Sequence, residues 1–363
     1  MKIGILGAGQ LGRMLALAGY PLDLDFVFLD PAEAACAAPL GEHIHADYAD
    51  EHALAEFCSR IAVATYEFEN VPLPAAEFVS GRVPLMPGAA ALQSFQDRLT
   101  EKTLFTELDI PVPPFVAVSS AAELSSAVEQ IGLPAVLKTR RLGYDGKGQA
   151  VLRELSDIEP AWQRLGGQDL ILEGFVAFER ELSIIAVRGQ NGECAFYPVC
   201  ENVHRDGILR LATPRANDAM QALAEAHARK ALEALDYVGV LAFEFFVEGD
   251  RLLANEIAPR VHNSGHWSIE GAECSQFENH LRAIAGLPLG STALRGPSAM
   301  INLIGQPPAT ADMAAVPGAH VHHYGKTPKP QRKVGHVTVT AATEEQLLQR
   351  VSQVQALLGE GAP

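Results

Sequence analysis

The sequence contains little cysteine, and its cysteines form no recognisable pattern. Five of them are scattered over 363 residues without a C-x-x-C pair. This distribution argues against a disulfide framework and favours reduced thiols, so we expect a cytoplasmic protein. Also missing is an uncharged apolar run of about 18 residues, the length that a membrane-spanning helix needs. We therefore expect no membrane span.

Basic residues are scarce as well. The chain carries 28 lysines and arginines against 44 aspartates and glutamates, which leaves a formal net charge of −16. A surface of this sign repels a polyanion, so we expect no nucleic-acid partner. An anionic small molecule would still need a local basic pocket. The G-x-x-x-x-G-K-[ST] phosphate loop is absent from the sequence too.

Strands and helices alternate in the first 95 residues. The apolar β-type runs lie at 3–6, 26–29 and 61–65, and helical stretches lie between them at 11–18 and 51–60. This alternation predicts a parallel sheet with helical crossovers. We expect a Rossmann-like domain over residues 1–95.

The rest of the chain has a different organisation. Strands and helices mix without strict alternation over residues 96–295, where we expect a second domain with a lid subdomain at about 110–175. The tail, 296–363, has short β-like runs before a helix at 343–358, which predicts a small β-rich domain. The expected fold class is α/β in the first domain and α+β beyond it.

One hairpin, "VLAFEFFVEGDRLLANEIA", brings two carboxylates together. Its turn is centred near Gly249 and Asp250, so Glu244 and Glu256 are expected as cross-strand neighbours on one face. Such a pair repels unless a proton or a cation lies between the two groups, and apolar flanks raise the cost. With Asn255 as a further oxygen ligand, the pair suits Mg²⁺. The alternative is a solvent-facing pair on an edge strand.

A dense polar run follows this hairpin and contains Arg260, His262, Asn263 and Ser264. Polar loops just beyond a strand end are typical of functional sites. The alternative is a merely solvated loop.

An earlier hairpin, "AVLKTRRLGYDGKGQAVL", is basic where the other is acidic. Lys138 ends an apolar strand, where a lysine needs a partner, and Arg140, Arg141 and Lys147 lie around three glycines. Glycines let backbone N–H groups approach an anion, so the tip is a candidate phosphate cover. The alternative is a floppy basic tip. A polyphosphate with Mg²⁺ needs both a basic and an acidic half.

Between the hairpins lies "LILEGFVAFERELSII". An apolar strand ends at Glu173 and continues into Gly174, Phe175 and Val176, whose main chain can offer donors and acceptors to a nucleotide base. Glu181 is a candidate for ribose hydroxyls. From the residues alone, a solvated strand edge is the better interpretation of Glu179 and Glu181.

The opening "GAGQLG" has the spacing G-x-G-x-x-G between a strand and a helix, which predicts an anion site at a helix N-terminus. Together with Asp30 at the end of the second strand, it matches the fingerprint of a nicotinamide-dependent oxidoreductase. However, Asp30 followed by Pro31 also matches a helix N-cap. Farther on, His320, His322 and His323 alternate without an acidic partner nearby, which favours a structural role.

A set of motifs then appears in order along nearly the whole chain. They are "GAGQLGRML", "TYEFENVP", "FQDRLTEK", "LKTRRLGYDGKGQ", "EGFVAFERELS", "ENVHRDGIL", "FEFF", "NEIAPRVHNSGHWSIEG", "HHYGK" and "RKVGH". The chain resembles the ATP-grasp enzymes of purine biosynthesis, and among them the N5-carboxyaminoimidazole ribonucleotide synthetases. The resemblance implies a Rossmann-like pre-ATP-grasp domain, an ATP-grasp domain and a C-terminal β-rich domain.

The resemblance also implies an activity. ATP phosphorylates bicarbonate to carboxyphosphate, which carboxylates the exocyclic amine of 5-aminoimidazole ribonucleotide and releases ADP and phosphate. The implied cofactors are ATP and Mg²⁺, and the implied assembly is a homodimer. Because carboxyphosphate is labile in water, the site needs a lid, for which the glycine hairpin is the candidate.

The residue roles that the resemblance implies run along the motifs. Arg98 and Lys138 would contact the phosphates or base of ATP, and Tyr144, Asp145, Gly146, Lys147, Gly148 and Gln149 would close over the reactants. Glu173 and Val176, with Gly174 and Phe175 between them, would read adenine, Glu181 would bind the ribose, and His204 would lie by the nucleotide. Glu244 and Glu256 would bind Mg²⁺, and Arg260, His262 and Asn263 would hold bicarbonate and carboxyphosphate.

The ribonucleotide is expected at the two ends of the chain. Lys326, Arg332 and Lys333 form the densest basic cluster of the tail and would receive its phosphate; alternatively they are a charged loop between strands. Because the ATP motifs lie far downstream of the opening loop, we assign Gly9, Gln10 and Leu11 to this substrate, with Glu69 and Asn70 as companions.

Three other functions remain open from the sequence. One is a different ATP-grasp ligase, such as the formate-using glycinamide ribonucleotide transformylase. Another is the oxidoreductase that the opening loop suggests. The last is a non-catalytic nucleotide-binding regulator, which would have no need for the paired Glu244 and Glu256.

Overall fold

A computed structural model describes residues 1–143 and 148–359, and across these ranges the strands form sheets of four, four and nine strands. Tyr144, Asp145, Gly146 and Lys147 lie outside the described residues. The N-terminal sheet is parallel throughout, as the sequence predicts. Its strands are β1 (Lys2–Leu6), β2 (Asp25–Asp30), β3 (Glu42–His45) and β4 (Val63–Tyr66), in the order β3-β2-β1-β4, with helices α1 (Gln10–Gly19), α2 (Glu51–Arg60) and α3 (Leu73–Ser80).

Asp30 does not cap a helix, contrary to one of the two sequence interpretations. Turns follow it, and the next helical element is the 3-10 turn Ala38–Leu40. Instead, its carboxylate accepts N–H groups of Ala8, at 2.8 Å, and Ala32, at 2.7 Å. Asp30 therefore fastens the glycine loop to the end of β2.

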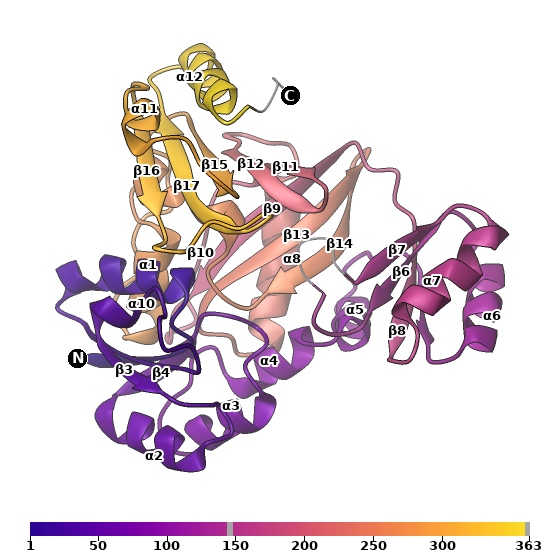
Figure 1. Cartoon of the computed structure of the whole chain (residues 1–363), viewed down its shortest axis with the longest axis horizontal. Coiled ribbons are helices and arrows are strands. Elements are labelled where there is room, and N and C mark those ends of the chain that lie inside the picture. Colours follow the sequence, from indigo (N-terminus) through magenta and orange to yellow (C-terminus); the bar gives the residue numbers. More distant parts are fainter. Residues whose placement is uncertain (144–147, 360–363) are drawn as a thin grey trace.

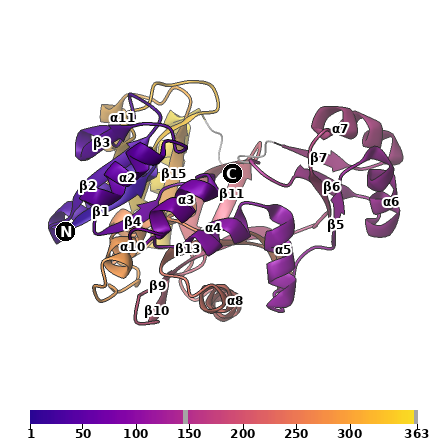
Figure 2. The ribbon, with the colours of Figure 1, turned by 90° about the horizontal axis from the view of Figure 1, so that it is seen from below.

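A small antiparallel sheet with its own apolar core projects from one side of the molecule (Figures 1 and 2). It consists of β5 (Phe115–Val118), β6 (Ala135–Thr139), β7 (Gln149–Leu152) and β8 (Leu170–Gly174) in the order β5-β8-β6-β7, with α6 (Ala121–Ile131) and α7 (Ile158–Leu165). The predicted basic hairpin is confirmed as β6 and β7, which pair antiparallel. This sheet lies within residues 110–175, the range expected for the lid, and its closure over a ligand stays a prediction.

The large sheet runs without interruption from the middle of the chain into the tail. Its strands are β9 (Arg180–Arg188), β10 (Cys194–Phe196), β11 (Cys200–Arg205), β12 (Ile208–Pro214), β13 (Gly239–Glu248), β14 (Arg251–Ala258), β15 (Ser298–Ile304), β16 (Ala319–His323) and β17 (Lys333–Thr340). They follow the order β14-β13-β9-β11-β12-β15-β17-β16, with β10 beside β9. Because Leu211 and Ala212 of β12 pair with β15, the tail shares its sheet with the middle of the chain.

Helices flank the large sheet and connect it to the other two. They are α4 (Ala89–Phe95), α5 (Arg98–Glu107), α8 (Gln221–Ala234), α9 (Ser268–Gly271), α10 (Gln276–Ile284), α11 (Thr310–Ala314) and α12 (Glu344–Leu357). On α10, buried His280 accepts the N–H of Val240 in β13 at 3.1 Å, and its other ring nitrogen lies 2.9 Å from the Thr65 hydroxyl in β4. His280 thereby links the N-terminal sheet to the large sheet. In the described part of the chain, no helix is long and apolar enough to cross a bilayer.

The acidic hairpin is confirmed as β13 and β14, with Glu244 opposite Glu256. Nearer the turn, Phe245 pairs with Ala254. One extra residue, Asn255, lies between these two pairs and forms a β-bulge. Bulges of this kind re-aim side chains next to functional sites. The bulge therefore determines which residue of β14 faces Glu244.

Candidate active site

A cavity of about 760 Å³ brings together residues from all three parts of the chain. The predicted site residues that line it are Gln10, Leu11, Glu69, Asn70, Arg98, Glu256, Arg260, His262, Asn263, Lys326, Arg332 and Lys333. Arg140, Leu142 and Gly143 line it from the lid side. The segments expected to bind substrate therefore open onto the same space as Arg98 and Glu256. Other described residues expected at the nucleotide or its cation, Lys138, Glu173, Glu181, His204 and Glu244, are not among those that line it.

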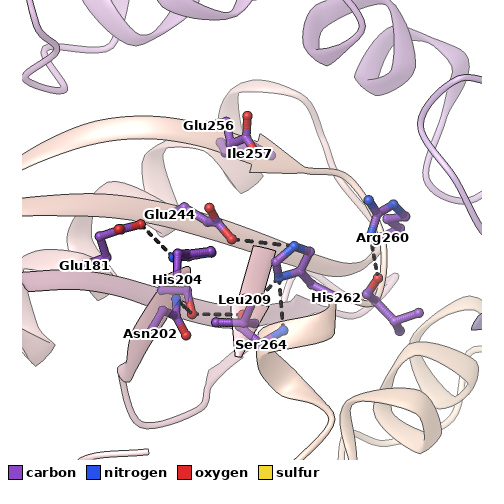
Figure 3. Close-up of polar contacts among 12 residues, drawn as sticks. Glu181, Asn202, His204, Leu209, Glu244, Glu256, Ile257, Arg260, His262 and Ser264 are labelled. Atoms are coloured by element: carbon purple, nitrogen blue, oxygen red, sulfur yellow. Dashed lines mark hydrogen bonds and ion pairs between the residues drawn. The ribbon is translucent and has the colours of Figure 1, made fainter. Parts of the chain in front are cut away.

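The two hairpin carboxylates are incompletely neutralised. An Arg98 NH group donates to Glu256 at 2.8 Å, and the His262 Nε2 lies 3.5 Å from Glu244. Burial and the charge of Glu256 raise the pKa of Glu244 to about 7. Burial would also raise the pKa of Glu256, but Arg98 outweighs it and the pKa is lowered. Figure 3 shows Glu244 between His204 and His262, with Glu256 on the strand beside it.

This donor set fits Mg²⁺. Two opposed carboxylates supply the hard oxygen ligands that Mg²⁺ prefers, and they gain most from a shared cation. In residues 1–143 and 148–359, no group of three or more His, Cys, Asp or Glu side chains is placed to hold a metal. A cation here would therefore take its remaining ligands from water and from a substrate's phosphates.

Lys138 has the partner that the sequence predicts for a lysine at this position. Its Nζ donates to Glu173 at 2.9 Å, and Lys102 Nζ lies 3.5 Å from the same carboxylate. Burial would raise the pKa of Glu173, but the two lysine charges outweigh it and lower the pKa to about 2. Glu173 is thus an ionised counter-charge between the lid and α5.

Other residues of the basic hairpin and of the segment after β8 lie around this cluster. Gly148 precedes β7, and Gln149 begins it. Gly174 ends β8, and Phe175 is exposed just beyond it. Arg140, expected as part of a phosphate cover, instead forms a bidentate pair with Asp97 at the start of α5. Contact of Gly148, Gln149, Gly174, Phe175 and Val176 with a nucleotide stays a prediction.

Glu181 and His204 form a pair next to Glu244. Glu181 Oε2 lies 2.9 Å from His204 Nδ1 (Figure 3). Burial would lower the pKa of His204, but Glu181 and Glu244 outweigh it and raise the pKa. The solvated-edge interpretation of Glu181 is wrong, because β9 lies between β13 and β11.

His262 is held by Ser264, which belongs to the predicted polar run, and by Gln276, which sequence reasoning missed. Its Nδ1 accepts the N–H of Ser264 at 3.3 Å, so Nε2 carries the proton and faces Glu244. The side chain of Gln276, fully buried on α10, accepts the backbone N–H of His262 and donates to the backbone carbonyl of His262. Burial and the charge of Arg260 lower the pKa of His262 well below its usual value. A neutral imidazole therefore points its N–H at the carboxylate.

Arg260 and Glu69 form an ion pair across the cavity wall. Burial would raise the pKa of Glu69, but the charge and hydrogen bond of Arg260 outweigh it and lower the pKa to about 2. Because Glu69 follows β4 and Arg260 follows β14, the pair joins the ends of two different sheets.

The glycine loop does bind a carboxyl group, but the group belongs to the chain itself. Gly9 and Gly12 donate their N–H groups to the two oxygens of buried Glu67, the second at 2.7 Å. A side chain at Gly9 would collide with this carboxyl. Burial raises the pKa of Glu67, and the two N–H groups oppose that rise. These amides are therefore unavailable to a substrate phosphate or a dinucleotide.

The basic cluster of the tail lies near this loop. Lys326 donates to the Gln10 side chain, which links the tail to the start of α1. Arg332 and Lys333 line the same cavity, and so does Lys329, which sequence reasoning did not single out. Burial lowers the pKa of Lys326.

The expectation that the histidines of β16 have no acidic partner nearby is wrong. His322 Nε2 lies 2.8 Å from the Glu270 carboxylate of α9, so it does have an acidic partner. Its ring also stacks on buried His336. Glu270 is distant in sequence, and no local pattern points to it.

Models of three domain families match the chain in succession. They are described as ribonucleotide synthetase preATP-grasp domain, over residues 1–96, ATP-grasp domain, over 103–277, and phosphoribosylaminoimidazole carboxylase C-terminal domain, over 298–350. The expected fold class is confirmed.

Relatives match over the whole length. The chain is 56% identical to an N5-carboxyaminoimidazole ribonucleotide synthase of Pseudomonas aeruginosa, and the match covers 99% of both chains. Among solved structures, the N5-carboxyaminoimidazole ribonucleotide synthetase from Thermus thermophilus has 56% sequence identity to this chain. Its TM-score is 0.94, and the match covers 98% of both chains. An Aspergillus clavatus synthase in complex with ADP and 5-aminoimidazole ribonucleotide is 34% identical, has a TM-score of 0.91, and is covered to 98% by 99% of this chain. Identity of this extent over the full chain shows that the protein belongs to the N5-carboxyaminoimidazole ribonucleotide synthase family of ATP-grasp enzymes.

Proposed function

We propose that the protein carboxylates 5-aminoimidazole ribonucleotide with bicarbonate at the expense of ATP, in purine biosynthesis. The γ-phosphoryl group passes from ATP to a bicarbonate oxygen and gives ADP and carboxyphosphate. The exocyclic amine then attacks the carboxyl carbon, phosphate leaves, and the amine loses a proton. The products are N5-carboxyaminoimidazole ribonucleotide, ADP and phosphate.

The observation that carries this proposal is the single cavity shared by three charged groups of residues. Glu256 and Arg98 mark one part of it, and the polar loop from Arg260 to Asn263 another. The basic cluster Lys326, Arg332 and Lys333 forms a third part. ATP, bicarbonate and a ribonucleotide phosphate need such charges within one water-poor space.

The proposed roles of the residues are those that the family resemblance implies, and the cavity supports them for the residues that line it. Arg98 and Lys138 bind ATP with Gly148, Gln149 and the residues between Gly143 and Gly148. Glu173 to Val176 lie at the base, and Glu181 and His204 at the ribose. Arg260, His262 and Asn263 hold bicarbonate and the developing carboxyphosphate. Gln10, Leu11 and Asn70 face the ribonucleotide, whose phosphate meets the basic cluster; Gly9 and Glu69 shape this end of the cavity through Glu67 and Arg260.

Glu244 and Glu256 are the proposed ligands of Mg²⁺, with Asn255 beside them. When bound, the ion neutralises phosphate charge during transfer. His262, which is neutral and donates toward Glu244, keeps that carboxylate oriented, and Arg98 does the same for Glu256.

An enzyme-linked assay of ADP release tests the proposal. We expect release that requires both 5-aminoimidazole ribonucleotide and bicarbonate. Release only with glycinamide ribonucleotide and formate would assign the chain to the other ligase reaction. NADH formation in place of ADP release would support the oxidoreductase.

Further properties of the protein are part of this proposal. The domain boundaries at 95/96 and 295/296 can be tested by limited proteolysis, and the homodimer by light scattering of the purified protein. A cytoplasmic location is supported by the cysteines, all of which are free.

A further inference from the structure

The β-bulge at Asn255 is fastened from outside the hairpin. An extra residue in a strand leaves part of the ladder unpaired. Here Lys102, a fully buried side chain of α5, donates its Nζ to the carbonyls of Ala254, at 3.0 Å, and Asn255, at 2.9 Å. The bulged carbonyls thus receive their hydrogen bonds from a helix.

The residue before Lys102 holds the other side of the bulge. Glu101, also buried, accepts the N–H of Ile257 at 2.6 Å. Two consecutive residues of α5 therefore bracket Glu256: Lys102 on its N-terminal side and Glu101 on its C-terminal side. Neither residue lies on the hairpin, and neither was assigned a role from the motif "FQDRLTEK".

The helix that carries this bracket is itself fixed. Asp97 caps α5 by accepting the N–H of Leu99 at 3.0 Å, and Arg140 holds Asp97 through two hydrogen bonds. One turn before Lys102, Arg98 contacts the Glu256 carboxylate directly. The start of α5 is thus a rigid support for both the backbone and the side chain of Glu256.

We propose that Glu101 and Lys102 are positioning residues that hold the bulge of β14 and so aim Glu256 at a divalent cation shared with Glu244. Without the bracket, β14 can relax toward the register of the turn, in which Asn255 replaces Glu256 opposite Glu244. This inference rests on the proposed nucleotide site and its cation, but not on the identity of the carboxylated substrate.

A matched pair of variants tests the reach of the Glu101 side chain to Ile257. Glu101→Gln keeps the reach and an acceptor oxygen, whereas Glu101→Asp keeps the carboxyl group but draws it back from Ile257. The measurement is ADP binding by calorimetry, with and without Mg²⁺. We expect Glu101→Gln to keep the wild-type tightening by Mg²⁺, and Glu101→Asp to lose about tenfold of it, as outer partners of metal ligands do. Metal-free ADP binding should change little.

A second pair tests the lysine. Lys230 also donates to two carbonyls, those of Leu108 and Asp109, but at the far end of α5. We expect Lys102→Met to lose the Mg²⁺ effect on ADP binding and Lys230→Met to retain it. Thermal unfolding without Mg²⁺ checks that each variant is folded, and if Lys102→Met does not fold, the Glu101 pair decides.

Other outcomes would overturn the inference. Folded Glu101→Asp with the full Mg²⁺ effect would show that the contact with Ile257 does not aim Glu256. Equal losses in Glu101→Gln and Glu101→Asp would also contradict the inference, because Gln retains an acceptor for Ile257. ADP binding does not involve 5-aminoimidazole ribonucleotide, so a failure of the proposed carboxylation leaves these results interpretable.

Discussion

Two pairs of glutamates in this protein have opposite surroundings. Glu67 and Glu69, at the end of β4, have partners from the chain itself: backbone N–H groups for the first and Arg260 for the second. Glu244 faces Glu256 and a histidine that burial keeps neutral. The comparison teaches that the first pair is framework, whereas the second has charge left for a cation.

The largest expected effect comes from removing a proposed metal ligand. Glu256→Gln should lower the rate of ADP release by about a thousandfold, because phosphoryl transfer loses its charge neutralisation. Steady-state kinetics at saturating substrates measure this, and an unfolding midpoint near that of the wild type shows that the fold survives. Wild-type rates at ordinary Mg²⁺ would remove Glu256 from the ligand set.

For Glu67 and Glu69, the framework pair, we expect substitutions to lower the stability of the fold. Glu67→Leu leaves the N–H groups of Gly9 and Gly12 buried without an acceptor, which costs on the order of 3 kcal/mol in the free energy of unfolding. Urea denaturation checks the value, and Glu67→Gln, which retains one acceptor oxygen, should lose less. A Leu variant as stable as the wild type would mean that the loop does not depend on this carboxyl.

Acid should weaken the ion pair between Glu69 and Arg260. Its folded pKa of about 2 lies below the usual 4.5, so its stabilisation is complete above about pH 4.5 and is lost as the pH falls toward 2. Allowing for its partial exposure, the loss is on the order of 2 kcal/mol. Unfolding of wild type and Glu69→Gln across this window measures the difference, and parallel pH curves would contradict it.

The smallest expected effect is a gain in stability, in contrast to the losses expected for the framework pair. Without Mg²⁺, Glu244→Gln should stabilise the protein by about 1 kcal/mol, because it relieves repulsion with Glu256. Adding Mg²⁺ with ADP should raise the unfolding midpoint of the wild type more than that of the variant. A destabilised Glu244→Gln would place this residue with the framework pair and end the distinction.

Much of the fold could be predicted because its signals are local. The alternation before residue 66 indicated the parallel sheet, and the turn at Gly249 indicated the pairing of Glu244 with Glu256, both of which the structure confirms. The site was harder. Gln276, Glu101 and Lys102 act through main-chain atoms far away in sequence, and such contacts leave no periodicity to recognise.

By itself, the sequence determined the strands, the two oppositely charged hairpins and the family, because apolar periodicity, turn residues and motif order are properties of neighbouring residues. Only the tertiary structure decided what each charge faces. It placed Glu67 in the glycine loop, Arg260 on Glu69 and Lys102 on the bulge. Hydrogen bonds and ion pairs act within about 3–4 Å, so their partners are defined only once distant segments are packed together.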